Sequence, residues 1–323
     1  MSPESIFKPG LIIFLSLFAI RTCPAQSTAK GTLTLPDHRF EVPFIWKKDS
    51  MNQRVEPYAA MLIPVKLPGC PKRFYMQFDV GAPYSVFYRN KIQTIGSRYP
   101  LSAKVNDSTM RLNEFSFLAG NTKIMAHEIV VKPLGNPQIN WKRDALEIIG
   151  TLGIDFIGNN TISIDYPAKK IRIGYKLPDN QPYTLTDLIY TNNTIIFPAS
   201  IKGKKTMLLF DSGSSAFELL TSEQTAATLA VPGTVPAIYP VSSWGRILTA
   251  TSYASNDSIE IASVKIPLNR VAYIEGASDG DKKRMMQMGI GGLTGNRLFL
   301  QSILVLDLAG KRFGIIKGKA RQL

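Results

Sequence analysis

The same short pattern occurs twice in this chain, once in each half. Residues 74–82 read Phe-Tyr-Met-Gln-Phe-Asp-Val-Gly-Ala, and residues 206–215 read Thr-Met-Leu-Leu-Phe-Asp-Ser-Gly-Ser-Ser. Each is an apolar run typical of a strand, which ends on an aspartate with glycine two positions later. A single Asp-x-Gly would indicate an ordinary turn, because Asp and Gly are common turn residues. Two at equivalent places in a repeated unit predict two carboxylates brought together by a pseudo-twofold axis.

The repeat extends well past the aspartates. A strand, a turn and a second strand lead to each aspartate, over residues 61–79 and 195–211. An apolar segment with glycine follows later in each half, at residues 150–157 and 292–299, and each half then closes with a hairpin. The same order of elements therefore occurs twice. An internal repeat of this kind strongly constrains the fold.

Strand-forming runs dominate the rest of the chain, and Gly, Pro, Asn and Asp separate them at short spacing. This pattern predicts an all-β fold, mostly strands with a few short helices. The better helix candidates are Thr221–Ala230 and Ala145–Ile149, and the predicted strands include Ile247–Tyr253 and Ser258–Ile266. A length of 323 residues with 45% hydrophobic content suits one large domain or two lobes of ordinary size.

These motifs resemble those of the bilobal pepsin/retropepsin-like aspartic peptidases, including bacterial-type aspartyl protease-like proteins. That family carries Asp-Thr/Ser-Gly-Ser/Ala in each lobe and, later in each lobe, an apolar pair followed by glycine. Residues 211–214, Asp-Ser-Gly-Ser, fit this motif fully, and residues 79–82, Asp-Val-Gly-Ala, fit at three of four positions. Leu152-Gly153 and Thr294-Gly295 stand where the second element belongs. The resemblance covers residues 55–318 and implies a two-lobed acid-protease-like double β-barrel with pseudo-twofold symmetry.

On this basis the chain divides into four parts. Residues 1–25 are a predicted signal peptide, 26–54 an N-terminal extension, 55–185 the first aspartic-peptidase-like lobe and 186–323 the second. The leader has Lys8 before an apolar run at residues 11–20, which is too short to span a bilayer comfortably, and Ala25 is its expected cleavage point.

A signal peptide predicts export to the periplasm or the extracellular space. A buried first strand or helix is one alternative for the apolar run. A second alternative is a lipid anchor at Cys23, which Ile20-Arg-Thr-Cys23 fits poorly because Arg is unexpected before such a cysteine.

The resemblance implies that Asp79 and Asp211 are the catalytic pair. Hydrolysis of a peptide bond by water needs a base for the water and an acid for the carbonyl oxygen. Two carboxylates about 3 Å apart cannot both ionise, so one member supplies the base and the other the acid. The sequence does not assign the proton to either member, because coupled groups titrate as a pair.

Four further residues are expected to support this pair. Gly81 and Gly213 would allow a sharp turn and let amide groups approach the carboxylates. Ser212 is expected to donate its hydroxyl across to the opposite lobe, and Ser214 to bond the outer oxygen of Asp211. In the family a hydroxyl stands after each aspartate, and the hydrogen bonds of the two hydroxyls to the opposite lobe form a cross-lobe clasp. Val80 departs from the family, because valine has no hydroxyl to make the first-lobe half of this clasp.

Two other hypotheses therefore stay open. One is a catalytically impaired, peptidase-like protein that binds polypeptide or a cell-surface ligand, and Val80 is the feature that supports it. The other is an unrelated exported β-protein whose two Asp-x-Gly turns are structural. The separation of the two carboxylates distinguishes the last hypothesis from the first two.

The family covers its cleft with a β-hairpin flap that carries an aromatic residue near a glycine. Residues 239–253, with Trp244 and Gly245, most resemble such a hairpin, but they lie in the second lobe whereas the pepsin flap lies in the first. The first-lobe counterpart, residues 106–115, has no aromatic-Gly pair. Trp244 and Gly245 are thus flap candidates, with a surface-turn or core tryptophan as the alternative.

The remaining features exclude other classes of function. The net charge of +14 comes largely from basic clusters at predicted hairpin tips, whereas nucleic-acid binding needs them on one face with interleaved aromatics. His38 and His127 lie far apart without metal-ligand spacing, so no metal or other cofactor is expected. Cys70 would be the lone cysteine after leader cleavage. The expected partner is a polypeptide substrate, with no nucleic acid and no stable membrane span. A monomer is expected, because both halves of the site lie in one chain.

Overall fold

The computed structural model describes residues 33–51, 54–106, 108–176, 183–243, 245–275 and 289–318. The predicted signal peptide, Cys23 and the flap candidate Trp244 lie outside these residues. Among the described residues, no helix has the length and apolar character that crossing a membrane requires.

The described residues of the first repeat form strands of varied length, one α-helix and one 3-10 helix. In chain order these are β1 (Leu33–Thr34), β2 (Phe40–Pro43), β3 (Ile45–Met51), β4 (Arg54–Lys66), β5 (Arg73–Phe78), β6 (Val86–Tyr88), α1 (Arg89–Arg98), β7 (Arg111–Ala119), β8 (Thr122–Lys132), β9 (Ile148–Leu152), η1 (Ile154–Phe156), β10 (Thr161–Asp165) and β11 (Lys170–Ile173).

The second repeat follows nearly the same order. Its elements are β12 (Thr186–Asp187), β13 (Ile189–Thr191), β14 (Thr194–Ile201), β15 (Lys204–Phe210), η2 (Ser212–Ser214), β16 (Leu219–Thr221), α2 (Glu223–Leu229), β17 (Ala237–Ser243), β18 (Arg246–Ile261), β19 (Val264–Glu275), β20 (Ile290–Thr294), η3 (Asn296–Phe299), β21 (Ser302–Asp307) and β22 (Arg312–Lys317). The prediction of a mostly β chain with few short helices is confirmed.

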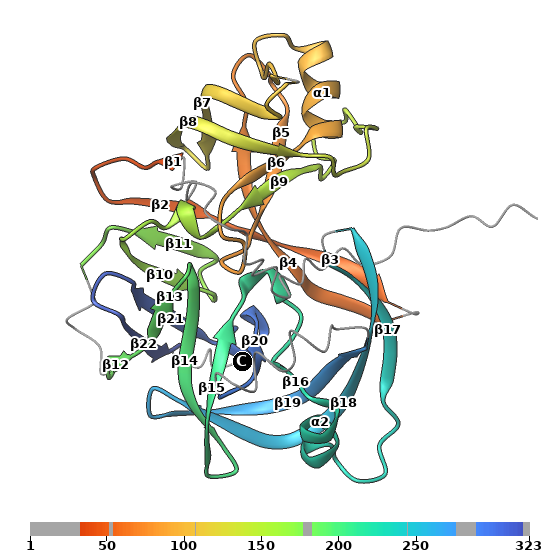
Figure 1. Ribbon diagram of the computed structural model, residues 1–323, viewed down its shortest axis with the longest axis vertical. Coiled ribbons are helices and arrows are strands. Elements are labelled where there is room, and N and C mark those ends of the chain that lie inside the picture. The colour runs from red at the N-terminus through yellow and green to blue at the C-terminus, as the bar shows by residue number, and fades with distance from the viewer. Residues whose placement is uncertain are drawn as a thin grey trace, which may run out of the picture.

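These strands form three sheets, one for each lobe and one shared (Figure 1). The first-lobe sheet has the order β1-β8-β6-β9-β5-β4-β3, with β7 paired to β4 and β8, and the second-lobe sheet has the order β13-β14-β15-β20-β16-β19-β18-β17. The shared sheet, β12-β22-β21-β10-β11-β2, joins the two repeats through antiparallel pairing of β10 with β21. The two lobes are therefore tied together at their base by continuous backbone hydrogen bonding.

The pseudo-twofold relation is visible in the pairing itself. Strand β5 runs parallel to β9 with a register shift after Tyr75, and β15 runs parallel to β20 with a register shift after Met207. Strands β2 and β12 occupy the two outer edges of the shared sheet. Residues 40–51, which the sequence placed in an N-terminal extension, thus pair in the shared and first-lobe sheets as residues 186–191 do in the second repeat.

Three local predictions differ from the structure. The predicted strand Ser258–Ile266 is interrupted by a hairpin turn at Ala262 and Ser263, whose φ angles are 50° and 60°. The predicted helix Ala145–Ile149 is wrong, because Ile149 is fully buried in strand β9, where sheet packing overrides helix propensity. Helix α1 was missed because it has neither a capping side chain nor an acidic first turn, so its sequence lacks the usual start signal.

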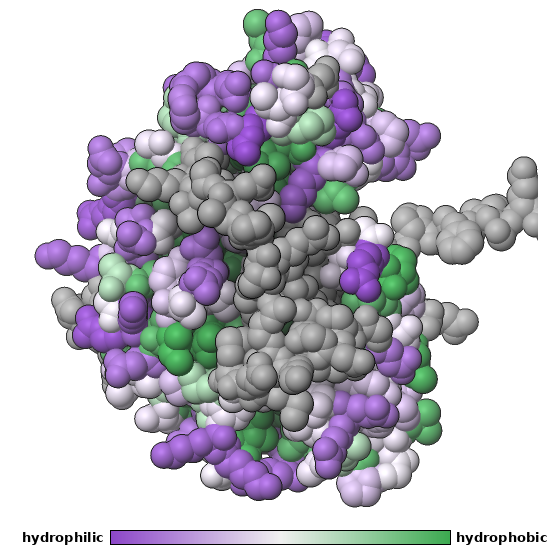
Figure 2. All heavy atoms as spheres, in the orientation of Figure 1, coloured by the Kyte–Doolittle hydropathy of each residue, from purple (hydrophilic) through white to green (hydrophobic). Residues whose placement is uncertain are grey.

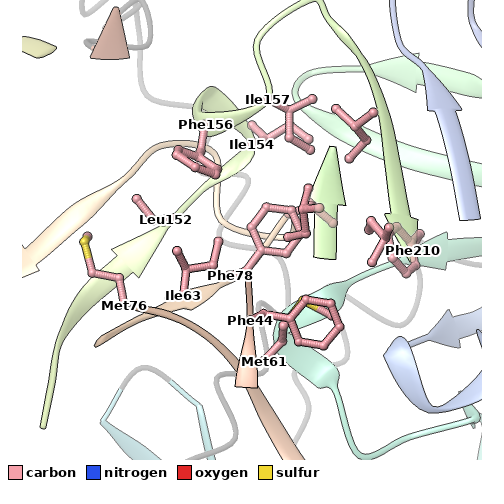
Figure 3. Close-up of a cluster of buried hydrophobic side chains, with 14 of the residues drawn as sticks. Phe44, Met61, Ile63, Met76, Phe78, Leu152, Ile154, Phe156, Ile157 and Phe210 are labelled. Carbon is pink, nitrogen blue, oxygen red and sulfur yellow. The ribbon is translucent and has the colours of Figure 1, made fainter. Parts of the chain in front are cut away.

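The apolar core spans both repeats. Phe78 and Phe210, the last residues of β5 and β15, are buried in the same cluster with Met61, Leu152 and other apolar side chains (Figure 3). Burial of a phenylalanine side chain stabilises the fold by roughly 2–3 kcal/mol. The residue after each phenylalanine is an aspartate, so the core fixes the two points from which the carboxylates project.

The surface mixes hydrophilic and apolar residues. On the face shown in Figure 2, the hydrophilic side chains are scattered over both lobes. The hairpin of β3 and β4 extends from the first lobe toward β17 of the second (Figure 1).

Candidate active site

Asp79 and Asp211 lie next to each other between the lobes. Each follows a strand that runs parallel to another, and the amide groups of Asp79 and Asp211 donate to the carbonyl oxygens of Leu152 and Thr294 at 2.9 and 3.0 Å. The exposed fractions of the two aspartates are 0% and 3%, and their side chains are hydrogen-bonded to each other. The repeat therefore brings together two buried carboxyl groups from distant parts of the sequence.

Backbone amides hold both carboxyl groups in the same way. The N–H groups of Gly81 and Ala82 donate to Asp79 Oδ1 at 3.0 and 3.1 Å. Those of Gly213 and Ser214 donate to Oδ1 of the second aspartate at 2.8 and 3.3 Å. Amide donors of this kind stabilise the charged form of a carboxyl group.

The outer oxygens differ between the two aspartates. The Ser214 hydroxyl donates to Oδ2 of Asp211 at 2.9 Å. The equivalent residue in the first repeat is Ala82, which has no hydroxyl. The pair is therefore symmetric in its amide donors, and the hydroxyl of residue 214 has no counterpart at residue 82.

Gly213 is needed for space rather than for an unusual backbone angle. Its φ angle is not in the positive region, but a Cβ at this position would lie 2.5 Å from Cγ of Asp79 and 2.6 Å from both of its carboxyl oxygens. Any side chain at residue 213 would therefore force the two carboxyl groups apart. The requirement for glycine comes from the close approach of the second loop to the first aspartate.

Burial raises the pKa of Asp211 above its ordinary value of 3.8. Hydrogen bonds from the Ser214 hydroxyl, from Asp79 and from the amides of Gly213 and Ser214 lower it in part. Because burial prevails, the pair retains a proton to a higher pH than an exposed aspartate would. A retained proton on a carboxyl pair is what acid–base chemistry at this site requires.

Ser212 links the two loops across the lobes, and Nε2 of Gln77 on β5 also donates to the carbonyl oxygen of Gly213 at 3.4 Å. Ser212 Oγ donates to the carbonyl oxygen of Phe78 at 3.1 Å and accepts from the amide of Val80 at 2.9 Å. Val80 occupies the corresponding position in the first loop and is buried, with an exposed fraction of 1%. Its side chain has no donor or acceptor, so this side-chain clasp is made from the second lobe alone.

Sequence reasoning missed several residues next to the pair. Asn296 donates to the carbonyl oxygen of Ser212, and Tyr166 donates to Asn296. Comparison of the two repeats could have identified Asn296. It follows Gly295 at the position where the apolar Ile154 follows Gly153 in the first repeat, so a polar residue replaces an apolar one there. Lys132, at the end of β8, was also missed.

Lys132 brings a positive charge close to the pair. Its Nζ lies 5.5 Å from the centre of the Tyr84 ring, in the loop that follows Asp79. Burial lowers the pKa of Lys132 from its ordinary value, and the charge of Asp79 acts in the opposite direction. This lysine therefore interacts electrostatically with the first carboxyl group.

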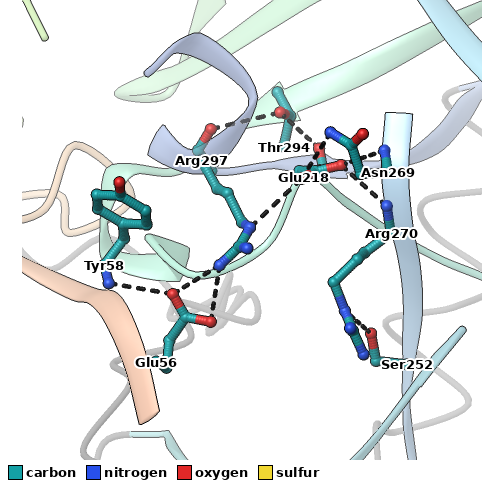
Figure 4. A network of polar contacts seen from close by, with 9 residues as sticks. Glu56, Tyr58, Glu218, Ser252, Asn269, Arg270, Thr294 and Arg297 are labelled. Carbon is teal, nitrogen blue, oxygen red and sulfur yellow. Dashed lines mark hydrogen bonds and ion pairs between the residues drawn. The ribbon is translucent and has the colours of Figure 1, made fainter. Parts of the chain in front are cut away.

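A second polar network joins the lobes beside the second loop (Figure 4). Arg297 binds both carboxyl oxygens of Glu56, from β4, at 2.7 Å and contacts Glu218 at 3.3 Å. Glu218 also accepts the amides of Asn269 and Arg270. The β3–β4 hairpin of the first lobe is thus anchored to the second lobe by buried charges. A pocket of about 260 Å³ lies beside this network, with Glu56 among its lining residues.

The hairpin of β17 and β18 reaches from the second lobe to the first. Its tip follows the pairing of Ser243 with Arg246, and Gly245 adopts a φ of +86° there. A Cβ built on Gly245 would lie 3.8 Å from Cδ2 of Leu134, in the segment after β8. Among the described residues of the first lobe, no strand corresponds to β17. The hairpin that reaches toward the opposite lobe is therefore on the second lobe.

Nothing among the described residues resembles a metal centre, because no group of three or more His, Cys, Asp or Glu side chains is close enough to hold an ion. Cys70 is buried in the turn before β5 and forms no disulfide within the described chain.

Comparisons with known proteins support the architecture at the level of the fold. The sequence matches no protein-family model, and a search of curated proteins finds no relative. Among solved structures, the crystal structure of an aspartic proteinase from Irpex lacteus superposes on this chain with a TM-score of 0.50 and 12% sequence identity. The match covers 88% of this chain and 99% of that one. The fold is thus that of the two-lobed, pepsin-like aspartic proteinases.

Proposed function

We propose that this protein is an aspartic endopeptidase in which Asp79 and Asp211 together activate a water molecule against a peptide bond of a polypeptide substrate. The observation that carries the proposal is the direct hydrogen bond between two buried carboxyl groups, each held by two backbone amides. The ionised member takes a proton from the water, and the protonated member donates to the carbonyl oxygen of the scissile bond. The fold shared with an aspartic proteinase supports this reading.

The test is cleavage of a denatured polypeptide by purified residues 26–323 over a wide pH range. Cleavage is expected at acidic pH, because the pair must keep one proton. Asp211→Asn should abolish it, since the amide cannot act as an acid or a base. Asp187→Asn is the matched control, because Asp187 is exposed on β12 and should leave the rate unchanged.

The second candidate function is that of a protein that binds polypeptide without cleaving it. The incomplete clasp between the loops favours this candidate. Val80 cannot supply the second half of the clasp, because its buried side chain has no donor or acceptor. The first loop therefore lacks a side-chain hydrogen bond that would hold it to the second. If wild type and Asp211→Asn show the same lack of cleavage at every pH while a denatured polypeptide still binds, this second function replaces the first.

Export is part of the proposal and is supported only by the sequence of residues 1–25. Expression of the full chain in a bacterium and fractionation of the cells should recover a processed protein in the periplasm or the medium. N-terminal sequencing should begin at residue 26. Labelling of Cys23 by a fatty acid would favour the lipid-anchored alternative. Light scattering on the processed protein tests the expected monomer.

The β17–β18 hairpin is proposed to cover the cleft from the second lobe. Its tip faces the first lobe at Leu134, whose Cδ2 would lie 3.8 Å from a Cβ at Gly245. Such a cover would exclude water from the pair and hold an extended substrate.

A further inference from the structure

A buried chain of hydrogen bonds runs from the first repeat to the carboxyl group of Asp211. The Tyr166 hydroxyl donates to Oδ1 of Asn296 at 2.9 Å, and Nδ2 of Asn296 donates to the carbonyl oxygen of Ser212 at 2.8 Å. That carbonyl and the N–H of Gly213 belong to one peptide group. The N–H donates to Oδ1 of Asp211 at 2.8 Å. Each group in the chain therefore donates toward the carboxylate.

The environment holds this chain in one arrangement. Tyr166 is 2% exposed, and Asn296 and Ser212 are fully buried. The Tyr166 ring is stacked with the rings of Phe299 and Trp46, with centroids 6.3 Å apart in both cases. Burial raises the pKa of Tyr166 well above its ordinary value, so the hydroxyl keeps its proton and donates. Nδ2 of Asn296 also donates to the hydroxyl of Ser215, which fixes the orientation of the amide.

The described residues of the first repeat contain no such chain of hydrogen bonds. Ile154 stands in the place of Asn296 after the equivalent glycine and has no polar side-chain atom. The amide of Gly81 donates to Asp79 at 3.0 Å, compared with 2.8 Å for its counterpart at Gly213. The chain is therefore specific to the second aspartate, and it begins on a residue of the opposite repeat.

We propose that Tyr166 and Asn296 are positioning residues, which hold the Ser212–Gly213 peptide against Asp211 and stabilise the ionised form of its carboxyl group. Consecutive hydrogen bonds polarise one another, so each donor strengthens the next. Hydrogen bonds to a carboxylate favour its charged form. The chain also links the second loop to Tyr166 of the first repeat and so restrains this loop. The Val80 side chain of the first repeat cannot provide such a restraint, because it forms no hydrogen bond. The effect of this chain on catalysis rests on the proposed function, whereas its effect on the ionisation of Asp211 does not.

Other groups also act on Asp211. Asp79 faces it across the pair, and the Ser214 hydroxyl and the amides of Gly213 and Ser214 donate to it. Lys132, on β8, adds a positive charge that interacts with Asp79. All of them remain when Tyr166 or Asn296 is changed, so the variants isolate the contribution of the chain.

The test is the titration of the aspartate carboxyl carbons by 13C NMR, with the Asp211 signal assigned from its loss in Asp211→Asn. Tyr166→Phe deletes only the terminal donor and should raise the midpoint of Asp211 by about half a pH unit. Asn296→Leu has nearly the same size, removes the donor to the Ser212 carbonyl oxygen without adding a charge, and should raise the midpoint by about one unit. Unchanged midpoints in both variants would overturn the proposal.

The control is Ser102→Ala, which deletes another buried hydroxyl whose bond to the Pro68 carbonyl oxygen is 2.7 Å long. It should leave the Asp211 midpoint unchanged, and an equal shift in this control would overturn the proposal. If the protein cleaves polypeptides, Tyr166→Phe should lower kcat at acidic pH about twofold to tenfold and leave KM unchanged. If wild type cleaves nothing, the proposed function fails while the titration still decides the role of the chain.

Discussion

Ser214 donates its hydroxyl to the outer oxygen of Asp211 at 2.9 Å, and the pseudo-twofold axis places Ala82, which has no hydroxyl, at the equivalent position beside Asp79. A hydrogen bond to a charged group contributes about 1.5–3 kcal/mol. At this position the two repeats differ by a single oxygen atom. Removing the hydroxyl at residue 214, or adding one at residue 82, would therefore give the two halves of the site the same side-chain donors at these positions.

Ser214→Ala should move the acidic limb of the rate profile toward higher pH by about one unit, because the ionised pair loses a donor. Ala82→Ser should move this limb toward lower pH, since a new hydroxyl can stabilise the ionised form of Asp79. The measurement is kcat/KM of each variant against pH. Ser97→Ala, which removes an exposed hydroxyl on α1, is the control and should leave the profile in place. Shifts of the same sign in both site variants would contradict this account.

Val80→Thr should complete the clasp between the loops. By the pseudo-twofold relation to Ser212, the new hydroxyl would accept from the amide of Ser212 and donate to the carbonyl oxygen of Phe210. Threonine has nearly the shape of valine, so the expected gain is that of one hydrogen bond, about 0.5–1.5 kcal/mol in the free energy of unfolding. Urea denaturation measures it.

Val65→Thr is the matched control for that gain. Val65 is fully buried among apolar side chains on β4, so its hydroxyl should cost about 1–3 kcal/mol. A loss of stability in Val80→Thr as large as in Val65→Thr would mean that the first loop has no place for a hydroxyl, and that the clasp is one-sided for packing reasons.

The sequence predicted the fold and the pair because both depend on a repeated order of elements. Asp79 and Asp211 each end an apolar strand, and two equal units that pack about an axis must bring such strand ends together. Asn296 and Tyr166 could not be found in this way, because they break the repeat rather than follow it. Each looks ordinary alone, and only the folded chain shows that they meet beneath the Ser212 carbonyl.

The turn at Ala262 and Ser263 was missed for a different reason. Both residues adopt positive φ, which the sequence usually signals by glycine or asparagine. Here the long pairing of β18 with β19 determines the position of the turn. Local preference was therefore overridden by contacts between residues that the sequence alone does not place side by side.

The stability of the protein should depend on the protonation of Asp211. The pKa of this group is raised by burial, so the folded state favours its neutral form. Its stabilising effect is fully present below the unfolded-state value near 3.8 and is lost as the pH rises through the higher folded value. Asp211→Asn carries no such titration. The Tm of Asp211→Asn minus that of wild type should therefore grow as the pH rises from about 4.

Scanning calorimetry at a series of pH values measures this difference. One kcal/mol corresponds to about 2–4 °C in Tm for a domain of 150–250 residues. Asp187→Asn, on the exposed edge strand β12, should show no trend with pH. A difference for Asp211→Asn that shrinks as the pH rises would mean that the folded state prefers the charged carboxyl, contrary to the effect of burial.

The position of Gly245 opposite Leu134 should matter for substrate affinity if the second-lobe hairpin covers the cleft. Leu134→Asp removes the apolar seat of the hairpin tip on the first lobe, and Trp244→Ala removes the aromatic residue next to that tip in sequence. Each change should raise KM for a polypeptide about threefold to tenfold with little change in kcat, because the cover contributes to binding. Because both changes disrupt the same closing of the hairpin over the cleft, the KM of the double variant should be little higher than that of either single variant. Leu101→Asp, at an exposed site of the first lobe, should leave KM unchanged. Effects that multiply in the double variant, or a fall in kcat alone, would show that the hairpin does not close over the substrate.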